Sequence, residues 1–144
     1  ALFDAMGQLV VHMGPQGHGS TVKLINNTLA AVNAAALAEG ITVGRQAGLD
    51  LGKAMEVLAS GSGNSTMREI KSGPMIDGDY DPLFKLEHML KDVRYFVAES
   101  REMGVLTGVA DSALDLYAEA DSDGYGQSDF AAVIEAIVTK SGLK

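Results

Sequence analysis

The chain has 144 residues, a mass of 15.0 kDa and 47% hydrophobic residues, which is enough for one globular domain with its own core. Its formal net charge is −8 at pH 7 and no run of Lys and Arg occurs, which argues against nucleic acid and anionic lipid as partners. The absence of cysteine excludes disulfides, thiolate metal sites and catalytic thiols, and it fits a cytoplasmic protein.

The first 13 residues differ from the rest of the chain. Residues 9–13 form a short segment that contains β-branched residues and is bounded by glycine and proline, a pattern that predicts one strand. Because a lone strand in an otherwise helical chain has no partner, we expect the amino end to be truncated.

The remainder of the chain has a helical pattern. Its most apolar segment, residues 24–38, is shorter than the roughly 20 residues of a membrane span and contains Asn and Thr, so we expect a buried helix and no membrane partner. In residues 84–103 the apolar positions recur at three- and four-residue intervals, as in an amphipathic helix. The sequence predicts an all-α domain of about six helices, at residues 19–47, 50–60, 66–71, 84–103, 106–120 and 128–139, with residues 72–82 as a loop.

Lys23 is the only charged residue between Asp4 and Glu39, and it lies in the apolar first helix. We expect hydrophobic neighbours to penalise its ammonium form, which would let the group exchange a proton with a substrate. Ser20, Lys23 and Asn27 follow at i, i+3 and i+7, so they share one helix face that can grip a carboxylate or a hydroxyl. The alternative is an ordinary solvated stripe in which Lys23 extends to the surface.

Other motifs give weaker signals. The glycines at positions 14, 17 and 19 superficially suggest a dinucleotide-binding turn, but their spacing is not G-x-G-x-x-G, and a tight strand-to-helix turn is the better interpretation. The Asp- and Gly-rich residues 121–129 fail as a calcium loop because Phe130 would occupy the ligating twelfth position. His12, His18 and His88 lack metal-ligand spacing, so we predict no metal site.

Four sequence blocks occur in an order that resembles one enzyme family. They are Gly17-x-Gly19-x-x-x-Lys23-x-x-x-Asn27, then Gly61-Ser62-Gly63 with Ser65, then Phe84 followed by Lys91-Asp92, and finally Gly124-x-Gly126-x-x-Asp129. Together they are similar to the β-hydroxyacid dehydrogenases, which include 3-hydroxyisobutyrate dehydrogenase, tartronate semialdehyde reductase and, more distantly, 6-phosphogluconate dehydrogenase.

The resemblance implies a domain organisation. In that family the last strand of an amino-terminal Rossmann domain leads into an all-α domain. Residues 1–13 then correspond to a remnant of that strand, and residues 14–144 correspond to the all-α substrate-binding and oligomerisation domain of the 6-phosphogluconate dehydrogenase C-terminal type. The chain by itself is expected to be inactive.

The resemblance also implies a reaction: the NAD- or NADP-dependent interconversion of a small β-hydroxy acid with its semialdehyde or keto acid. Lys23 is then the general acid and base, while Asn27, Ser20 and Gly19 bind the substrate. Lys91 and Phe84 are assigned to the cofactor, although Lys91 considered alone is an ordinary exposed helix lysine. The family implies a small carboxylate substrate and a homodimer or homotetramer.

Two points stay open at the level of sequence. Many members of the family have Asp-His where this chain has Asp129-Phe130, so the role of this pair is undecided. The alternative function is a non-catalytic helical dimerisation or interaction module, in which Lys23 pairs with a carboxylate of a partner.

Overall fold

The computed structural model describes residues 9–143, and within this range the chain is all-α, as predicted. The one isolated bridge in that range pairs Lys85 with Asp129. The six α-helices in the described range are α1 (His18–Gln46), α2 (Leu51–Ser60), α3 (Thr66–Asp77), α4 (Leu86–Glu102), α5 (Gly108–Ala120) and α6 (Val133–Lys140). A π-helical turn at Asp121–Tyr125 follows α5, and a 3-10 turn at Phe130–Ala132 precedes α6.

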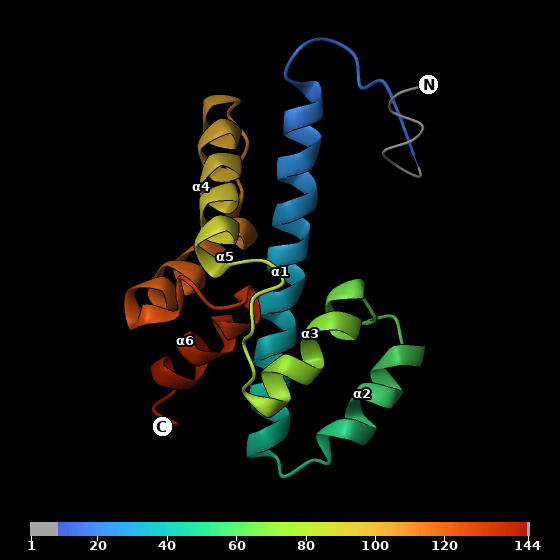
Figure 1. Cartoon of the computed structure of the whole chain (residues 1–144), viewed down its shortest axis with the longest axis vertical. Helices are drawn as coiled ribbons and strands as arrows, with labels where there is room; N and C mark the ends of the chain where they lie inside the picture. Colours follow the sequence, from blue (N-terminus) through green and yellow to red (C-terminus); the bar gives the residue numbers. More distant parts are fainter. Residues whose placement is uncertain (1–8, 144) are drawn as a thin grey trace.

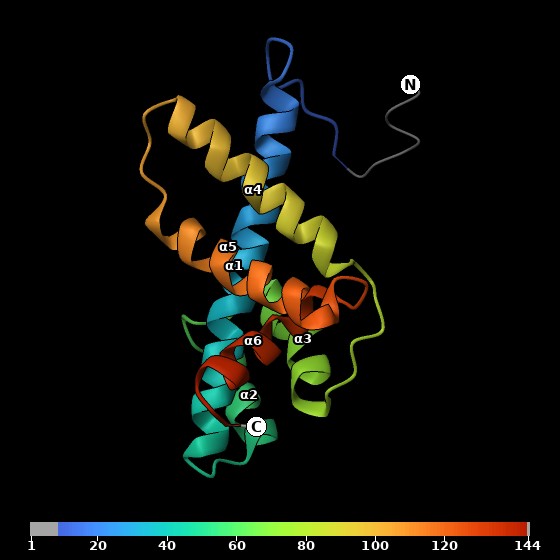
Figure 2. The ribbon, with the colours of Figure 1, turned by 90° about the vertical axis from the view of Figure 1, so that its left-hand side faces the viewer.

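The long helix α1 is the axis of the domain (Figure 1). Helices α3, α4, α5 and α6 pack around it, and α4 crosses its amino-terminal half obliquely (Figure 2). Its core face is made of small side chains, with Ala31, Ala34 and Ala38 completely buried. Alanines at this spacing lie on one side of a helix and let neighbouring helices approach closely. None of the described helices is long and apolar enough to cross a membrane.

The turn predicted ahead of the first helix is present. Gly14 and Gly17 have φ values of 101° and 98°, a region that favours glycine, and Gly17 is the amino-terminal cap residue of α1. Residues 9–13, in contrast, form no strand: they lead away from the helices and are exposed, with Leu9 at 82% (Figure 1). A strand needs a pairing partner, and none of the described residues supplies one. Residues 1–8 of the predicted strand remnant lie outside the described residues.

Helix α3 is longer than predicted, because it continues through Pro74 to Asp77. Packing outweighs the proline here, since Met75 is completely buried and Arg45 donates hydrogen bonds to the carbonyl oxygens of Met75 and Ile76 at 2.7 and 3.0 Å. The prediction of a loop at residues 72–82 was therefore wrong for its first half.

Candidate functional site

The candidate site is centred on Asp92, a carboxylate of α4 whose side chain is only 3% exposed. Lys23 Nζ lies 3.1 Å from Asp92 Oδ2, and Asn27 Nδ2 lies 2.6 Å from the same oxygen. Two α1 side chains that the sequence placed on one helix face therefore donate to the same carboxylate oxygen. They meet on an oxygen that lies 69 and 65 residues away in sequence.

The packing of α1 against α4 explains this meeting. On α1 the neighbouring side chains Leu24 and Thr28 are buried, so Lys23 and Asn27 lie at the edge of the buried stripe and face α4. On α4, Leu90 and Val93 are buried on either side of Asp92. The carboxylate is consequently carried into the helix interface, where it is satisfied by donors from α1.

The electrostatics of the cluster keep Asp92 ionised. Burial alone raises the pKa of the Asp92 carboxyl, but hydrogen bonds from Asn27 and Lys23 and the charges of Lys23 and Lys91 outweigh it and hold the pKa below its usual range. The site is therefore a charged cluster at neutral pH, with a fixed anion between cationic groups.

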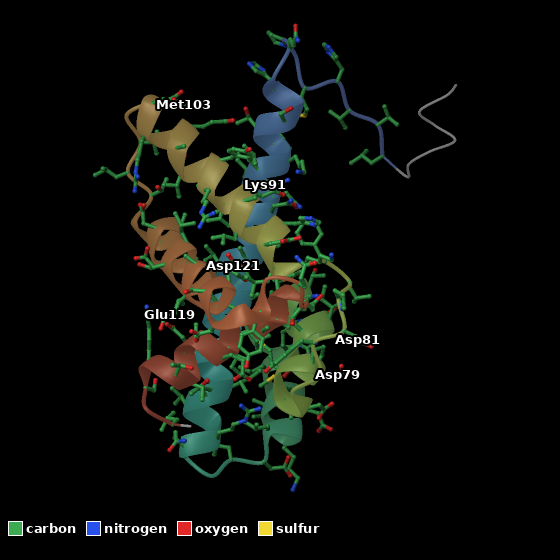
Figure 3. The ribbon with its side chains drawn as sticks, turned by 60° about the vertical axis from the view of Figure 1, so that its left-hand side comes forward. Asp79, Asp81, Lys91, Met103, Glu119 and Asp121 are labelled. Carbon is green, nitrogen blue, oxygen red and sulfur yellow. The ribbon has the colours of Figure 1, made fainter. Side chains whose placement is uncertain are left out.

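Lys91 contributes the second cation. Its Nζ lies 3.7 Å from Asp92 Oδ1, the oxygen that Lys23 does not contact, and its side chain is 53% exposed. Figure 3 shows Lys91 on α4 where this helix passes the amino-terminal half of α1. Each oxygen of one buried carboxylate thus has a lysine partner, while the side chains of both lysines are more than half exposed.

The expected apolar surroundings of Lys23 are not present. Its side chain is 61% exposed, and its hydrogen-bond acceptor among the described residues is the Asp92 carboxylate. The prediction failed because the apolar neighbours of Lys23 in sequence point toward other sides of the helix. Two cavities, of about 920 Å³ between α1 and α2 and of about 310 Å³ between α1, α4 and residues 106–110, are not lined by Lys23 either. The cluster lies on an open surface between α1 and α4.

The remaining predicted site residues lie around this cluster at varying distance. Ser20 and Gly19 are exposed in the first turn of α1, and a Cβ on Gly19 would meet no atom within 4 Å, so they border an open approach to Lys23. Phe84 is half-buried just before α4, and its ring centroid lies 5.9 Å from that of His88. His88 is one helical turn before Asp92 on α4, so Phe84 touches α4 at its beginning, one turn before the Asp92 cluster.

Sequence reasoning missed the central role of Asp92. One signal was present, because Asp92 follows Lys91 in a family-like block, but in the apolar pattern the two residues fill an ordinary polar gap between positions 90 and 93. The burial of Asp92 is a result of how α4 packs, and a buried carboxylate needs a partner because an unpaired charge there is very costly.

The glycines of the last sequence block have separate structural reasons. Gly124 has a φ of 96°, which sets the bend after α5. At Gly126 a Cβ would clash with the Asp121 carboxylate and would touch Glu87. These glycines let residues 121–129 pass closely beside the beginning of α4.

Comparison with known proteins gives the family of the chain. Residues 17–137 match a family model described as “NAD-binding of NADP-dependent 3-hydroxyisobutyrate dehydrogenase”. The chain belongs to this family of NAD(P)-dependent β-hydroxyacid dehydrogenases. The resemblance recognised in the sequence is thereby confirmed, and so is the fold class.

Proteins with sequences similar to this chain agree with the family match. The chain is 35% identical over 134 residues to glyoxylate/succinic semialdehyde reductase 2 of Arabidopsis thaliana, covering 93% of this chain and 37% of the relative. It is 32% identical over 146 residues to L-threonate dehydrogenase of Escherichia coli K12, covering 99% of this chain and 48% of the relative. The chain thus spans less than half the length of these relatives.

Solved structures give the same result. The 3-hydroxyisobutyrate dehydrogenase of Salmonella typhimurium superposes with a TM-score of 0.79 at 34% identity, over 83% of this chain and 42% of that chain. The Mycobacterium tuberculosis 3-hydroxyisobutyrate dehydrogenase, solved with L-serine, has a TM-score of 0.85 at 24% identity, over 94% of this chain and 49% of that chain, which shows a shared fold.

Proposed function

We propose that this chain is the substrate-binding and catalytic all-α part of a dehydrogenase that interconverts a small β-hydroxy acid with its semialdehyde or keto acid, with Lys23 as general acid and base. The observation that carries the proposal is the convergence of Lys23 and Asn27 on Asp92 Oδ2, at 3.1 and 2.6 Å. A fixed carboxylate holds both donors at the edge of α1 and keeps their orientation before a substrate arrives.

In the reductive direction Lys23 supplies the proton. Its ammonium group has three N–H donors, and one of them is directed at Asp92. As hydride adds to the carbonyl carbon of the substrate, the C=O π bond becomes a developing alkoxide, and an N–H of Lys23 gives its proton to that oxygen. The neutral amine then regains a proton from water, to which its 61% exposed side chain has access. In the oxidative direction the amine accepts the hydroxyl proton.

Asn27 and Asp92 have supporting roles. The Asn27 amide uses one N–H for Asp92, and its second N–H can bind the hydroxyl or the carboxylate of the substrate. Asp92 fixes the position of Lys23 and returns it to the same place after each proton transfer. A small carboxylate substrate suits this surface, because two lysines, Lys23 and Lys91, share the single negative charge of Asp92. One positive charge of the cluster is therefore left to attract an anionic substrate.

The nicotinamide cofactor, NAD or NADP, supplies and removes hydride when bound. On this chain the residues that fit its edge are Lys91, whose exposed ammonium can donate to ribose hydroxyls, and Phe84, whose half-buried ring gives an apolar contact. Lys91 lies on α4 beside Asp92, and Phe84 lies just before α4 begins. The described residues contain no glycine-rich strand-to-helix turn for the pyrophosphate. We infer that a preceding Rossmann domain provides most of the cofactor contacts, and that residues 1–13 lead from it.

Substrate binding can be tested on this chain directly. We expect 3-hydroxypropanoate and glycerate to shift the NMR signals of the Lys23 ammonium and the Asn27 side-chain amide in the parent chain, and we expect the shift of the Asn27 amide to disappear in Lys23→Ala. The matched control is Lys53→Ala, because Lys53 is an 81% exposed lysine of α2 that pairs with Asp50. An equal response of the Asn27 amide in Lys23→Ala and in the parent chain would remove the proposed substrate site.

Catalysis is tested in the protein that joins this chain to its dinucleotide-binding half. We expect Lys23→Ala to lower turnover of small hydroxy acids by about 10²-fold or more, the usual contribution of a general acid. Turnover within a few-fold of the parent contradicts the assigned chemistry. If the substrate shifts are also absent, the alternative of a non-catalytic helical interaction module is favoured.

A homodimer or homotetramer and a cytoplasmic location are further parts of the proposal. What supports association is the set of apolar side chains that this domain leaves exposed, among them Leu29 at 60%, Val43 at 68% and Val57 at 70%. Light scattering during gel filtration gives the oligomeric state, and cell fractionation gives the location.

A further inference from the structure

A second charged pair is buried deeper than the candidate site. Lys71 of α3 and Asp129, just before the 3-10 turn, have side chains that are each only 2% exposed. Lys71 Nζ lies 2.8 Å from Asp129 Oδ1 and 2.9 Å from Oδ2, and it also lies 4.2 Å from the centroid of the Phe130 ring. The proposed mechanism uses neither residue.

Asp129 is bound by more than its lysine. Its Oδ2 accepts hydrogen bonds from the backbone N–H groups of Leu83 and Phe84 at 3.0 and 3.2 Å, and its Oδ1 accepts from that of Ala131 at 2.9 Å. The carboxylate therefore accepts hydrogen bonds from two consecutive residues of the segment that leads into α4. These contacts bridge 45 and 46 residues of sequence.

The same segment provides the amino-terminal cap of α4. Its cap residue, Lys85, makes no side-chain capping hydrogen bond. Instead the N–H of Leu86 donates to the carbonyl oxygen of Ser128 at 2.9 Å, and that of Glu87 donates to Gly126 at 3.0 Å. Helix ends need such external acceptors for their first N–H groups. Figure 2 shows the orange-red loop before α6 beside this end of α4.

Phe84 is held on three sides by these residues. Its N–H donates to Asp129, its carbonyl oxygen accepts from the N–H of Phe130 at 3.1 Å, and its ring packs edge-on against the Phe130 ring with centroids 6.2 Å apart. The Asp129-Phe130 pair, whose role the sequence left open, thus determines where Phe84 lies.

We propose that the Lys71–Asp129 pair is a positioning element of the candidate site, which fixes Phe84 and the first turn of α4 and thereby sets the register in which Asp92 meets Lys23 and Asn27. Asp92 lies two helical turns beyond residue 85, so a shift of the start of α4 moves its carboxylate along α1. The positioning role rests on the proposed function, whereas the geometry it predicts can be measured without turnover.

The decisive comparison is made in a Lys71→Met background, where the buried cation is absent from both variants. Asp129→Asn keeps an oxygen that can accept from Leu83 and Phe84, whereas Asp129→Ala removes it. We expect the Asn27 side-chain amide signals and the low carboxyl titration midpoint of Asp92 to be retained with Asp129→Asn. With Asp129→Ala we expect the Asn27 signals to move toward those of a free amide and the Asp92 midpoint to rise.

Identical Asn27 and Asp92 signals in the two double variants would overturn the positioning role. The matched control is Tyr117→Phe, which removes the buried 3.1 Å hydrogen bond from Tyr117 to the Ala31 carbonyl without touching the start of α4. We expect it to lower stability and to leave the Asn27 and Asp92 signals unchanged. If it moves them as Asp129→Ala does, general loosening explains the effect and the positioning role is wrong.

A measurement on the unmodified chain covers the case in which a variant does not fold. Native-state hydrogen exchange follows the amides of Leu83, Phe84, Leu86 and Glu87. We expect all four to open in one step with a common dependence on denaturant. Opening of Leu86 and Glu87 that is more than about tenfold more frequent than that of Leu83 and Phe84, a difference comparable to one hydrogen bond, would show that α4 begins independently of Asp129 and would overturn the proposal. Retained turnover in Lys23→Ala, in contrast, removes the proposed function and leaves these signals as they are.

Discussion

The side-chain amide of Asn27 donates a 2.6 Å hydrogen bond to Asp92 Oδ2, the oxygen that also accepts from Lys23 at 3.1 Å. An amide and an ammonium on one carboxylate oxygen form a small network, in which each donor orients the other through the shared acceptor. Removing either donor leaves the carboxylate with one partner fewer at this oxygen, so we expect the three residues to behave as one unit in mutational experiments.

The first prediction concerns acid stability. Because the folded-state pKa of Asp92 is held below the ordinary value of 3.8, the unfolded chain binds this proton more readily than the folded chain does. The contribution of Asp92 to stability is therefore complete above the ordinary pKa and is lost as pH falls through the folded pKa. We expect Asp92→Asn to lose less stability than the parent between neutral pH and pH about 3, measured by urea unfolding.

Asp115→Asn is the control for that experiment, since Asp115 is an exposed aspartate of α5. We expect its acid profile to follow that of the parent. A parallel profile for Asp92→Asn as well would show that the Asp92 carboxylate is not preferentially stabilised by Asn27 and Lys23.

The second prediction separates charge from proton transfer at position 23. Lys23→Arg keeps a cation that can bind Asp92, so we expect its stability to lie within about 0.5 kcal/mol of the parent. A guanidinium does not release its proton at the working pH, so we expect turnover of the full-length enzyme to fall by about 10²-fold. If Lys23→Arg retains parental turnover, position 23 contributes charge alone.

The sequence was sufficient for the fold class and for one half of the site. Periodicity and caps located most of the helices, and the i, i+3 and i+7 spacing placed Lys23 and Asn27 on one face. This spacing could not show which residues the face of α1 contacts, because those contacts depend on how α4 crosses α1. The exposure of Lys23 was misjudged for a different reason: side chains adjacent in sequence point toward different sides of a helix, so the apolar residues next to Lys23 in sequence do not surround it.

Two features could not be obtained from local sequence. Pro74 predicts the end of a helix, but the burial of Met75 and the Arg45 hydrogen bonds carry α3 past it. The Lys71–Asp129 pair joins residues 58 positions apart, and Lys71 was expected at the end of a helix where lysine is common. Tertiary packing decides both cases, and no local propensity reports it.

The third prediction concerns the stability of the buried pair. Lys71→Met leaves the Asp129 carboxylate buried without its cation, and we expect a loss of about 3 to 5 kcal/mol in the free energy of unfolding. In the double variant with Asp129→Asn neither position 71 nor position 129 carries a buried charge, so we expect a smaller loss than in the single variant. Urea unfolding of the parent, the single and the double variant measures this, and a double variant less stable than Lys71→Met would contradict it.

The fourth prediction concerns two tyrosines at alkaline pH. Burial raises the pKa of the Tyr117 hydroxyl, with Asp129 adding to the effect, and burial together with the Glu135 hydrogen bond raises the pKa of Tyr80. The unfolded chain therefore releases these protons more readily, so stability is complete below the ordinary tyrosine value of 10.0 and falls as pH rises above it.

Tyr80→Phe isolates one of these two contributions. It removes the 2.7 Å hydrogen bond to Glu135 Oε1, and we expect a cost of about 1 kcal/mol at neutral pH. Above pH about 10 we expect this difference to shrink, because the parent then loses stability through Tyr80 while the variant has no hydroxyl to ionise at that position. Urea unfolding at several pH values, with tyrosinate absorbance recorded in parallel, measures both effects. A difference that stays constant across this range would mean that Tyr80 ionises equally easily in the folded and the unfolded chain.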